Sequence, residues 1–310
     1  MAPLLSHEAV CEGAISLGFT ACGIAPAASV SPLAARRYRQ WLEHGGHADM
    51  QYLAEHVDMR LDPTLLLPGA RSVIVVAMSY APAHRLPAGE YQLSAYAYGQ
   101  DYHNVIKGRL RQLVQRLSLQ SDEVKIATDT VPLLERYWAR QAGLGFIGRN
   151  HQLIIPHAGS MFFLGEIVTI LPADRYDRPQ PNRCGRCRRC LDACPTAALG
   201  PDGLAARRCL AYQTIEHRGA LDPDVAPRLA PTIFGCDRCQ EACPWNRLAT
   251  PTTIPEFQPS PRLLAMRRAD WHALTIEDYR ILFRGSAVKR AKYEGLMRNI
   301  HAVEQAMEAE

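Results

Sequence analysis

The sequence of 310 residues contains no apolar run that approaches the roughly 18–20 residues a membrane-spanning helix needs. Its N-terminal segment also lacks the basic start of a signal peptide, and Glu8 and Glu12 stand where such a peptide is apolar. The segment is typical instead of an amphipathic helix capped by Ser6. We therefore expect a cytoplasmic protein, a monomer without a membrane partner.

Nucleotide-binding fingerprints are missing as well. No GxGxxG turn opens a helix after a strand, and no phosphate-binding GxxxxGKS/T loop occurs, so binding of NAD or ATP is not indicated. Lysine is scarce, because the 35 basic residues include only Lys107, Lys125, Lys289 and Lys292, and the rest are arginines. Arginine suits phosphate contacts, but the codon bias of a GC-rich genome is the simpler explanation. The net charge of +4 does not by itself identify a nucleic-acid-binding protein.

Cysteine is almost absent from the first 180 residues, where only Cys11 and Cys22 occur, and we expect these two to be buried structural thiols. The other eight of the ten cysteines lie between residues 184 and 243. Cytoplasmic thiols stay reduced, so this concentration indicates metal binding rather than disulfides.

The eight cysteines form two related patterns. The first is C-x2-C-x2-C-x3-C-P, and the second ends in C-x2-C-x3-C-P. In the bacterial ferredoxin run of this type, the fourth cysteine binds the other of two clusters. The sequence therefore predicts two 4Fe–4S clusters, one held by Cys184, Cys187, Cys190 and Cys243, the other by Cys194, Cys209, Cys236 and Cys239. Zinc knuckles also use C-x2-C pairs, but they do not account for the repeated x3-C-P ends.

Helical and extended patterns alternate in the first 178 residues. Helices are predicted at 32–46, at 101–120 after a cap at Asp101, and from Pro132 to Gly143. A buried strand is predicted at 71–80, a second strand at 124–130, and a hairpin around 157–160. We expect an α/β domain in which helices flank one mixed sheet.

Several long segments, YGQDYHNVIKGRL (98–110), DTVPLLERYWARQAGLGFIGRNHQLIIPHAGSMFFLGEI (129–167) and both cysteine blocks, resemble the epoxyqueuosine reductases. The resemblance implies an α+β protein with a nitroreductase-like cobalamin-binding domain at 1–178 and a two-cluster ferredoxin-type domain at 179–250. A C-terminal helical, HEAT-like segment at 251–310 would follow, shorter than in many members of that family.

The same resemblance implies an activity. The family removes the epoxide oxygen of epoxyqueuosine at the wobble position of tRNA, the last step of queuosine biosynthesis. It uses base-off cobalamin and electrons from two 4Fe–4S clusters, and the sequence does not identify the electron donor. A reductive dehalogenase combines the same cofactors and is the alternative, although such enzymes usually carry a twin-arginine signal. A simple ferredoxin-like carrier would leave the first domain unexplained.

By resemblance, Asp129 is the proton donor, which requires burial to raise its pKa from about 4. The alternative is that Asp129 only caps the helix after it. The resemblance also places the following residues, together with Asp129, around cobalamin or substrate: Arg60, Tyr102, Arg136, Asn150, His151 and Ser160. His103 is expected to be a solvated or capping residue. Near the C-terminus, four basic residues could contact tRNA phosphates or form a solvated face: Lys289, Arg290, Lys292 and Arg298.

Overall fold

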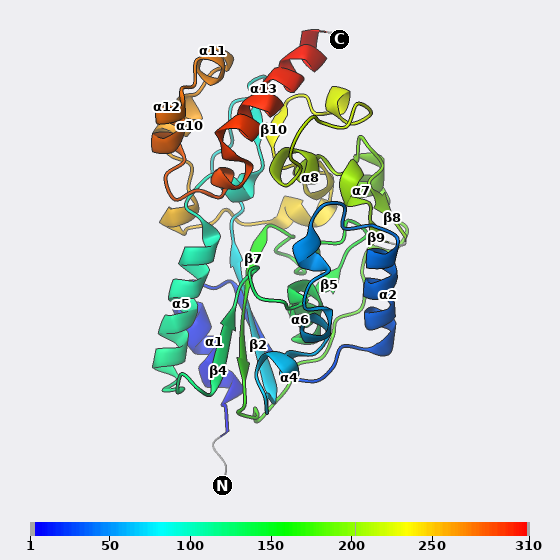
Figure 1. Cartoon of the computed structure of the whole chain (residues 1–310). Helices are drawn as coiled ribbons and strands as arrows, with labels where there is room; N and C mark the ends of the chain where they lie inside the picture. The colour runs from blue at the N-terminus through cyan, green and yellow to red at the C-terminus, as the bar shows by residue number, and fades with distance from the viewer. Residues whose placement is uncertain (1–3, 202, 309–310) are drawn as a thin grey trace.

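The computed structural model describes residues 4–201 and 203–308. Its central element is a four-stranded sheet in the order β1 (Ala21–Pro26), β2 (Ser72–Ser79), β7 (Phe162–Thr169) and β4 (Val124–Ala127) (Figure 1). All three pairings in this sheet are antiparallel, so the expectation of a mixed sheet is wrong. The reason is that a strand buried on both faces reads as one continuous apolar run, which does not reveal its direction.

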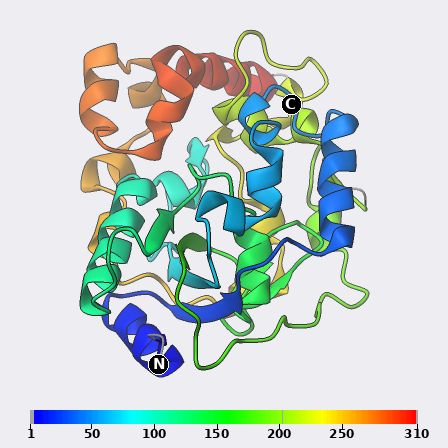
Figure 2. The ribbon, with the colours of Figure 1, turned by 60° about the horizontal axis from the view of Figure 1, so that its bottom comes forward.

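Helices cover both faces of the sheet. On one face α1 (His7–Ser16) and α5 (Tyr102–Arg116) pack in a core that includes Ile74 and Val76 of β2. On the other face, Val73 and Val75 of the same strand join a second core with Trp138 of α6 (Glu135–Gln141). Seen from below, α2 (Pro32–Glu43) lies on the side of the molecule opposite α5 (Figure 2).

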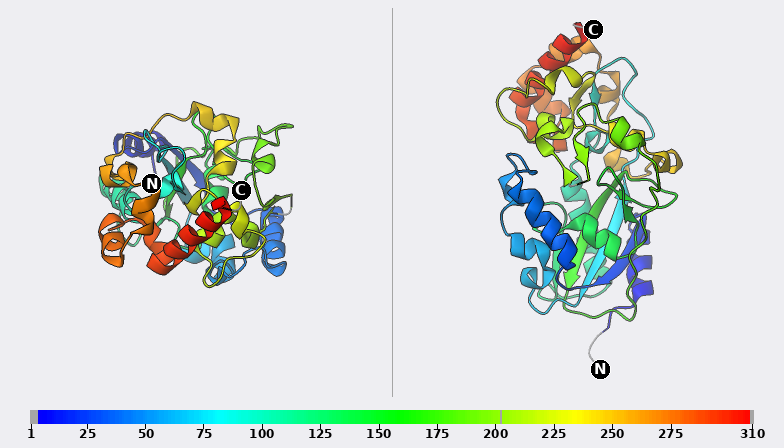
Figure 3. Two further views of the ribbon diagram at one scale, coloured as in Figure 1. Left: turned by 90° about the horizontal axis from the view of Figure 1, so that it is seen from above. Right: turned by 90° about the vertical axis from the view of Figure 1, so that its right-hand side faces the viewer.

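The cysteine-rich segment and the C-terminal helices lie above this sheet (Figure 1; Figure 3, right). Strand β10 (Thr232–Phe234) pairs in parallel with β3 (Gln92–Leu93) from the first part of the chain. Helix α13 (Lys292–Glu308) packs against β10 and against α8 (Leu210–Ile215). One core therefore runs through all three predicted domains, and the boundaries at 178 and 250 stay a prediction.

The remaining elements are short. They are η1 (Gln51–Leu53), α3 (Val57–Leu61), α4 (Pro63–Leu66), η2 (Ala95–Ala97), β5 (Phe146–Ile147), β6 (Leu153–Ile154), α7 (Arg189–Asp192), β8 (Leu199–Gly200), β9 (Gly203–Leu204), η3 (Ala206–Arg208), η4 (Ala226–Arg228), α9 (Arg238–Glu241), η5 (Pro244–Leu248), η6 (Pro255–Phe257), α10 (Pro261–Ala265), α11 (Arg268–His272), α12 (Ile276–Leu282) and η7 (Ala287–Ala291). Within the described ranges, no helix is both long enough and apolar enough to span a membrane.

The predicted caps are confirmed, because the side chains of Ser6 and Asp101 accept hydrogen bonds at the starts of α1 and α5. Helix α6 begins at Glu135 rather than Pro132, since the preceding residues form a tight turn. The predicted hairpin is reduced to one bridge between Ile155 and Gly159. Its second strand pairs with β2 and β4 instead, which bury it more completely.

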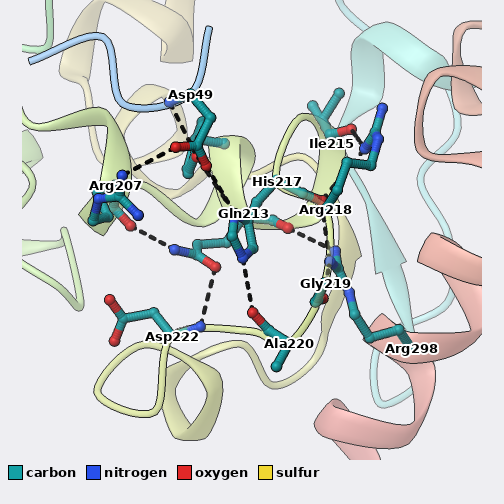
Figure 4. Close-up of polar contacts among 11 residues, drawn as sticks. Asp49, Arg207, Gln213, Ile215, His217, Arg218, Gly219, Ala220, Asp222 and Arg298 are labelled. Atoms are coloured by element: carbon teal, nitrogen blue, oxygen red, sulfur yellow. Dashed lines mark hydrogen bonds and ion pairs between the residues drawn. The ribbon is translucent and has the colours of Figure 1, made fainter.

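Helix α13 is joined to the cysteine-rich segment by polar contacts of Arg298 and Asn299. The guanidinium of Arg298 donates to the carbonyls of His217 and Gly219 at 3.0 and 2.8 Å (Figure 4). Beside it, the Nδ2 of Asn299 donates to the carbonyls of Thr214 and Ile233, both at 2.9 Å. Arg298 therefore serves the fold and is half-buried rather than solvated, and a contact between Arg298 and tRNA phosphates stays a prediction.

We predict that Asn299→Leu lowers the unfolding free energy by about 2–4 kcal/mol, because two buried carbonyls lose their donor. Asn299 is fully buried. The matched control is His301→Leu on the exposed face of the same helix, which should change stability by no more than about 0.5 kcal/mol. Anaerobic urea unfolding compares the two, and equal stabilities would contradict the role of Asn299.

Candidate active site

Two adjoining cavities lie where the sheet meets the cysteine-rich segment. The larger, of about 800 Å³, is enclosed by η1, α3, the start of α5, the loop after β4, and η7. The smaller, of about 260 Å³, is lined by side chains from the start of α5, from α6 and from β7. Tyr96, Tyr102 and Asp129 line both cavities. Asp129 therefore faces the point at which the two spaces meet.

The backbone at Asp129 has the left-handed conformation, with a φ of 55°, which aspartate tolerates better than most residues. Its Oδ2 accepts hydrogen bonds from the Tyr102 hydroxyl at 2.8 Å and from the His103 Nε2 at 3.1 Å. Its backbone N–H donates to Oε1 of Glu135. Leu134 occupies the cap position of α6, so the alternative role of Asp129 as a cap is wrong.

Asp129 and His103 form an ion pair. Burial acts to raise the pKa of Asp129, but the hydrogen bonds from His103 and Tyr102 outweigh it and hold the pKa below its ordinary value. Burial acts to lower the pKa of His103, but the carboxylates of Asp101 and Asp129 raise it to about 9. At neutral pH the proton therefore resides on His103, and Asp129 is ionised.

Two expectations are corrected by this geometry. The pKa of Asp129 is lowered rather than raised, because a cation lies against its carboxylate. His103 is neither solvated nor a cap, since its ring lies between the carboxylates of Asp101 and Asp129. A histidine two residues after a helix cap gives no local sign of a contact with Asp129, which depends on the loop after β4.

The other residues expected around a cofactor are only partly brought together. Arg136 and Ser160 line the smaller cavity with Tyr102 and Asp129, and Arg60 lines the larger one. Asn150 and His151 lie beside the smaller cavity. The carbonyl of His151 accepts a hydrogen bond from Arg136 at 2.7 Å, and Nδ2 of Asn150 donates to the carbonyl of Cys239 at 3.4 Å.

Two carboxyl groups near Asp129 were not anticipated. Glu135 lines the smaller cavity, and burial raises its pKa to about 7, with the charge of Asp129 acting in the same direction. Glu166, in the middle of β7, is fully buried. A single acid within the apolar run FFLGEIVTI was the available signal, because an ionisable group in a buried strand is a site candidate.

The cysteine thiolates influence one another within two sets. The pKa of Cys243 is raised by burial and by the nearby thiolates of Cys184 and Cys187. Burial likewise raises the pKa of Cys190, and Cys243 contributes. The last cysteine of the second block therefore lies with the first block.

The second group mirrors the first. Burial raises the pKa of Cys236 to about 12, and the Cys209 thiolate adds to the effect. The pKa of Cys239 is raised by burial and then by Cys236, Cys209 and Cys194. In the described ranges no three His, Cys, Asp or Glu side chains converge as they would on a single ion. A 4Fe–4S cluster distributes its thiolates over four irons, and ligation by these two groups stays a prediction.

The second cysteine group adjoins the smaller cavity. Gln240, which follows Cys239, donates through Nε2 to the hydroxyl of Tyr80 at 3.2 Å and accepts from the hydroxyl of Ser160 at 3.0 Å. Tyr80 and Ser160 both line that cavity. A redox group bound there would thus lie next to the cysteines of the second group.

Comparisons with known proteins agree with this arrangement. A family model described as "Epoxyqueuosine reductase QueG, DUF1730" matches residues 60–130, and one described as "4Fe-4S double cluster binding domain" matches residues 183–246. The epoxyqueuosine reductase of Cellulophaga algicola is 41% identical over 93% of this chain and 94% of its own length. That of Leadbetterella byssophila is 42% identical over 94% and 96%.

The chain belongs to the epoxyqueuosine reductase family. A crystal structure of an epoxyqueuosine reductase with an epoxyqueuosine-modified tRNA stem loop matches 96% of the chain and 80% of its own, with a TM-score of 0.85 and 28% identity. The family and the α+β fold are thereby confirmed, and residues 183–246 match the double-cluster domain.

Paired cysteine variants test the crossed ligand sets. Cys184→Ala with Cys243→Ala removes two ligands of one predicted cluster, and about half of the roughly eight irons should remain. Cys184→Ala with Cys194→Ala removes one ligand from each cluster and should lower iron content further. Iron and sulfide analysis after anaerobic reconstitution distinguishes them. Equal iron contents for the two pairs, or stoichiometric zinc in the wild type, would overturn the assignment.

The raised pKa of Glu135 predicts a pH-dependent stability. The folded state binds more protons than the unfolded state between the ordinary value of 4.5 and about 7, so stability falls as pH rises through that window. The melting temperature of the wild type should fall between about pH 6 and about pH 8, and that of Glu135→Gln should fall by less. The exposed control Glu43→Gln should leave this decrease unchanged, and an undiminished decrease in Glu135→Gln would contradict the assignment.

Proposed function

We propose that this chain reduces epoxyqueuosine in tRNA to queuosine. The reaction consumes two electrons and two protons, converts the epoxide to an alkene and releases its oxygen as water. Family membership supports the reaction type. The observation that carries the proposal is the His103–Asp129 ion pair, which lies between two cavities and near a cysteine group suited to a cluster. The dehalogenase alternative loses its support through the family assignment.

The cofactors of the proposed reaction are two 4Fe–4S clusters, held by the two cysteine groups, and base-off cobalamin. The cavities suit a large flat group, because aromatic side chains line both and the larger has a volume of about 800 Å³. Tyr102, Arg136 and Ser160 would hold cobalamin, with Arg60 at the adjoining cavity. Cobalamin, when bound, supplies a low-potential cobalt centre for the two-electron reduction.

The chain's own residues supply and place a proton. Negative charge that develops on the epoxide oxygen is stabilised when a proton reaches it. His103 stores that proton at neutral pH, and its Nε2 lies 3.1 Å from Oδ2 of Asp129. Asp129 receives the proton and delivers it into the cavity. Tyr102 donates to the same oxygen at 2.8 Å and so fixes the direction of the carboxylate.

The macromolecular partner in this proposal is tRNA. The larger cavity, lined by Lys289, Arg290 and Arg60, would receive the modified base. Arg290 forms a bidentate ion pair with Glu216, in which Nη2 lies 2.6 Å from Oε2. The exposed candidates for phosphate contacts are therefore Lys289 and Lys292. We place the protein in the cytoplasm as a monomer, supplied by a separate electron donor.

We predict that Asp129→Asn retains both clusters and cobalamin but converts epoxyqueuosine about 10²- to 10⁴-fold more slowly, because asparagine cannot pass a carboxyl proton. The assay is single-turnover conversion of epoxyqueuosine-containing tRNA by chemically reduced enzyme. Asp122→Asn, exposed in the loop before β4, is the matched control and should react like the wild type. A wild-type rate in Asp129→Asn would place the proton donor elsewhere, and no conversion by the wild type would refute the proposed function.

A further inference from the structure

Glu166 is a buried acid that the proposed mechanism does not use. It lies in the middle of β7 and is fully buried, and no N–H or hydroxyl group of the described residues donates to its carboxyl oxygens, so that the carboxyl of Glu135 is the group within hydrogen-bonding reach. An ionised carboxylate in such a place would cost many kcal/mol, so the group is protonated. Burial accordingly raises its pKa well above the ordinary value, with Glu135 and Asp129 adding to the effect.

Glu135 connects this buried acid to the site. It is the first residue of α6, lines the smaller cavity with Asp129, and accepts a hydrogen bond from the Asp129 backbone. The charged groups around it are Asp129 in the loop after β4, Arg136 on α6, His103 on α5 and Glu166 on β7. Two carboxyl groups in such proximity do not both ionise readily, and they behave as one titrating pair.

The reaction requires more protons than the ion pair holds. Reduction of an epoxide to an alkene and water takes up two protons, whereas His103 and Asp129 together store one at neutral pH. Tyr102 also lines the cavity, but burial and the charge of Asp129 raise its pKa so far that it keeps its proton. Besides Asp129, the carboxyl group on the wall of the smaller cavity is that of Glu135.

We propose that Glu135 and Glu166 form a proton reserve that supplies the second proton of the reduction. Glu135 gives its proton to the departing oxygen in the cavity that it shares with Asp129, and the Glu135 carboxylate then shares the proton of Glu166, so that Glu166 is not left as a lone anion. The O–H bond of Glu135 breaks as the second O–H bond of water forms, and the pair keeps one negative charge until solvent restores the proton. The inference rests on the proposed function.

Infrared spectroscopy tests the protonation directly, without turnover. At about pH 8, above the pKa of Glu135, the wild type should show the carbonyl stretch of a protonated carboxyl, with the shift in heavy water that an exchangeable proton causes. Glu166→Gln should lose this band, whereas Glu43→Gln should retain it. A wild-type spectrum without the band, or a band that persists in Glu166→Gln, would overturn the proposal.

Single-turnover kinetics test the use of the proton. Glutamine has the shape of the neutral acid but cannot transfer a carboxyl proton, so Glu135→Gln and Glu166→Gln should bind tRNA with unchanged affinity and react at least about 10-fold more slowly at about pH 6, where Glu135 holds its proton. The loss should shrink at about pH 8, where Glu135 of the wild type is itself largely ionised. Glu43→Gln should match the wild type throughout.

The two proposals fail in different ways. If the wild type converts epoxyqueuosine and both glutamine variants follow its pH profile, the proton reserve is refuted and the proposed function stands. If the wild type does not convert the substrate, the proposed function is refuted, and so is the proposal that Glu135 and Glu166 supply the second proton. A loss that is equal at both pH values would indicate a structural effect of the substitution and would also refute the reserve.

Discussion

The contact between His103 and Asp129 determines what chemistry the cavity can perform, and it depends on how closely α5 approaches the sheet. Gly165 of β7 makes that approach possible, because a Cβ there would come within 2.6 Å of Ile106 and 3.0 Å of Leu110 on α5. With the helix this close, its first turn brings His103 to the loop after β4. A packing requirement in the core thus fixes the position of a proton in the site.

The cysteine-rich segment is tied to the same cavity through backbone and side-chain contacts. Strand β10 pairs with β3, and Gln240 bonds to Tyr80 and Ser160. Asp237, between two cysteines of the second group, accepts hydrogen bonds from Ser94 and from the backbone of Ala95. Neighbouring residues of one short loop therefore carry thiolates on one side and contact the cavity wall on the other.

The sequence predicted those features of the structure that depend on residues close together along the chain. The caps at Ser6 and Asp101 follow from spacing along the chain, and the structure confirms them. The resemblance placed Asp129 in the site, but its lowered pKa arises from a helix far away in sequence. The same limit applies to Glu135 and Glu166, whose proximity depends on the packing of α6 against β7.

The interlocking of β3, β10 and α13 also affects when the protein can be assembled. The carbonyls of Thr214 and Ile233 acquire their donor only when Asn299 of α13 is in place, and α13 follows every cysteine in the chain. During synthesis, the segment that carries the thiolates therefore leaves the ribosome before the helix that fixes it. The cysteine-rich segment therefore reaches its final packing only after α13 has been synthesised.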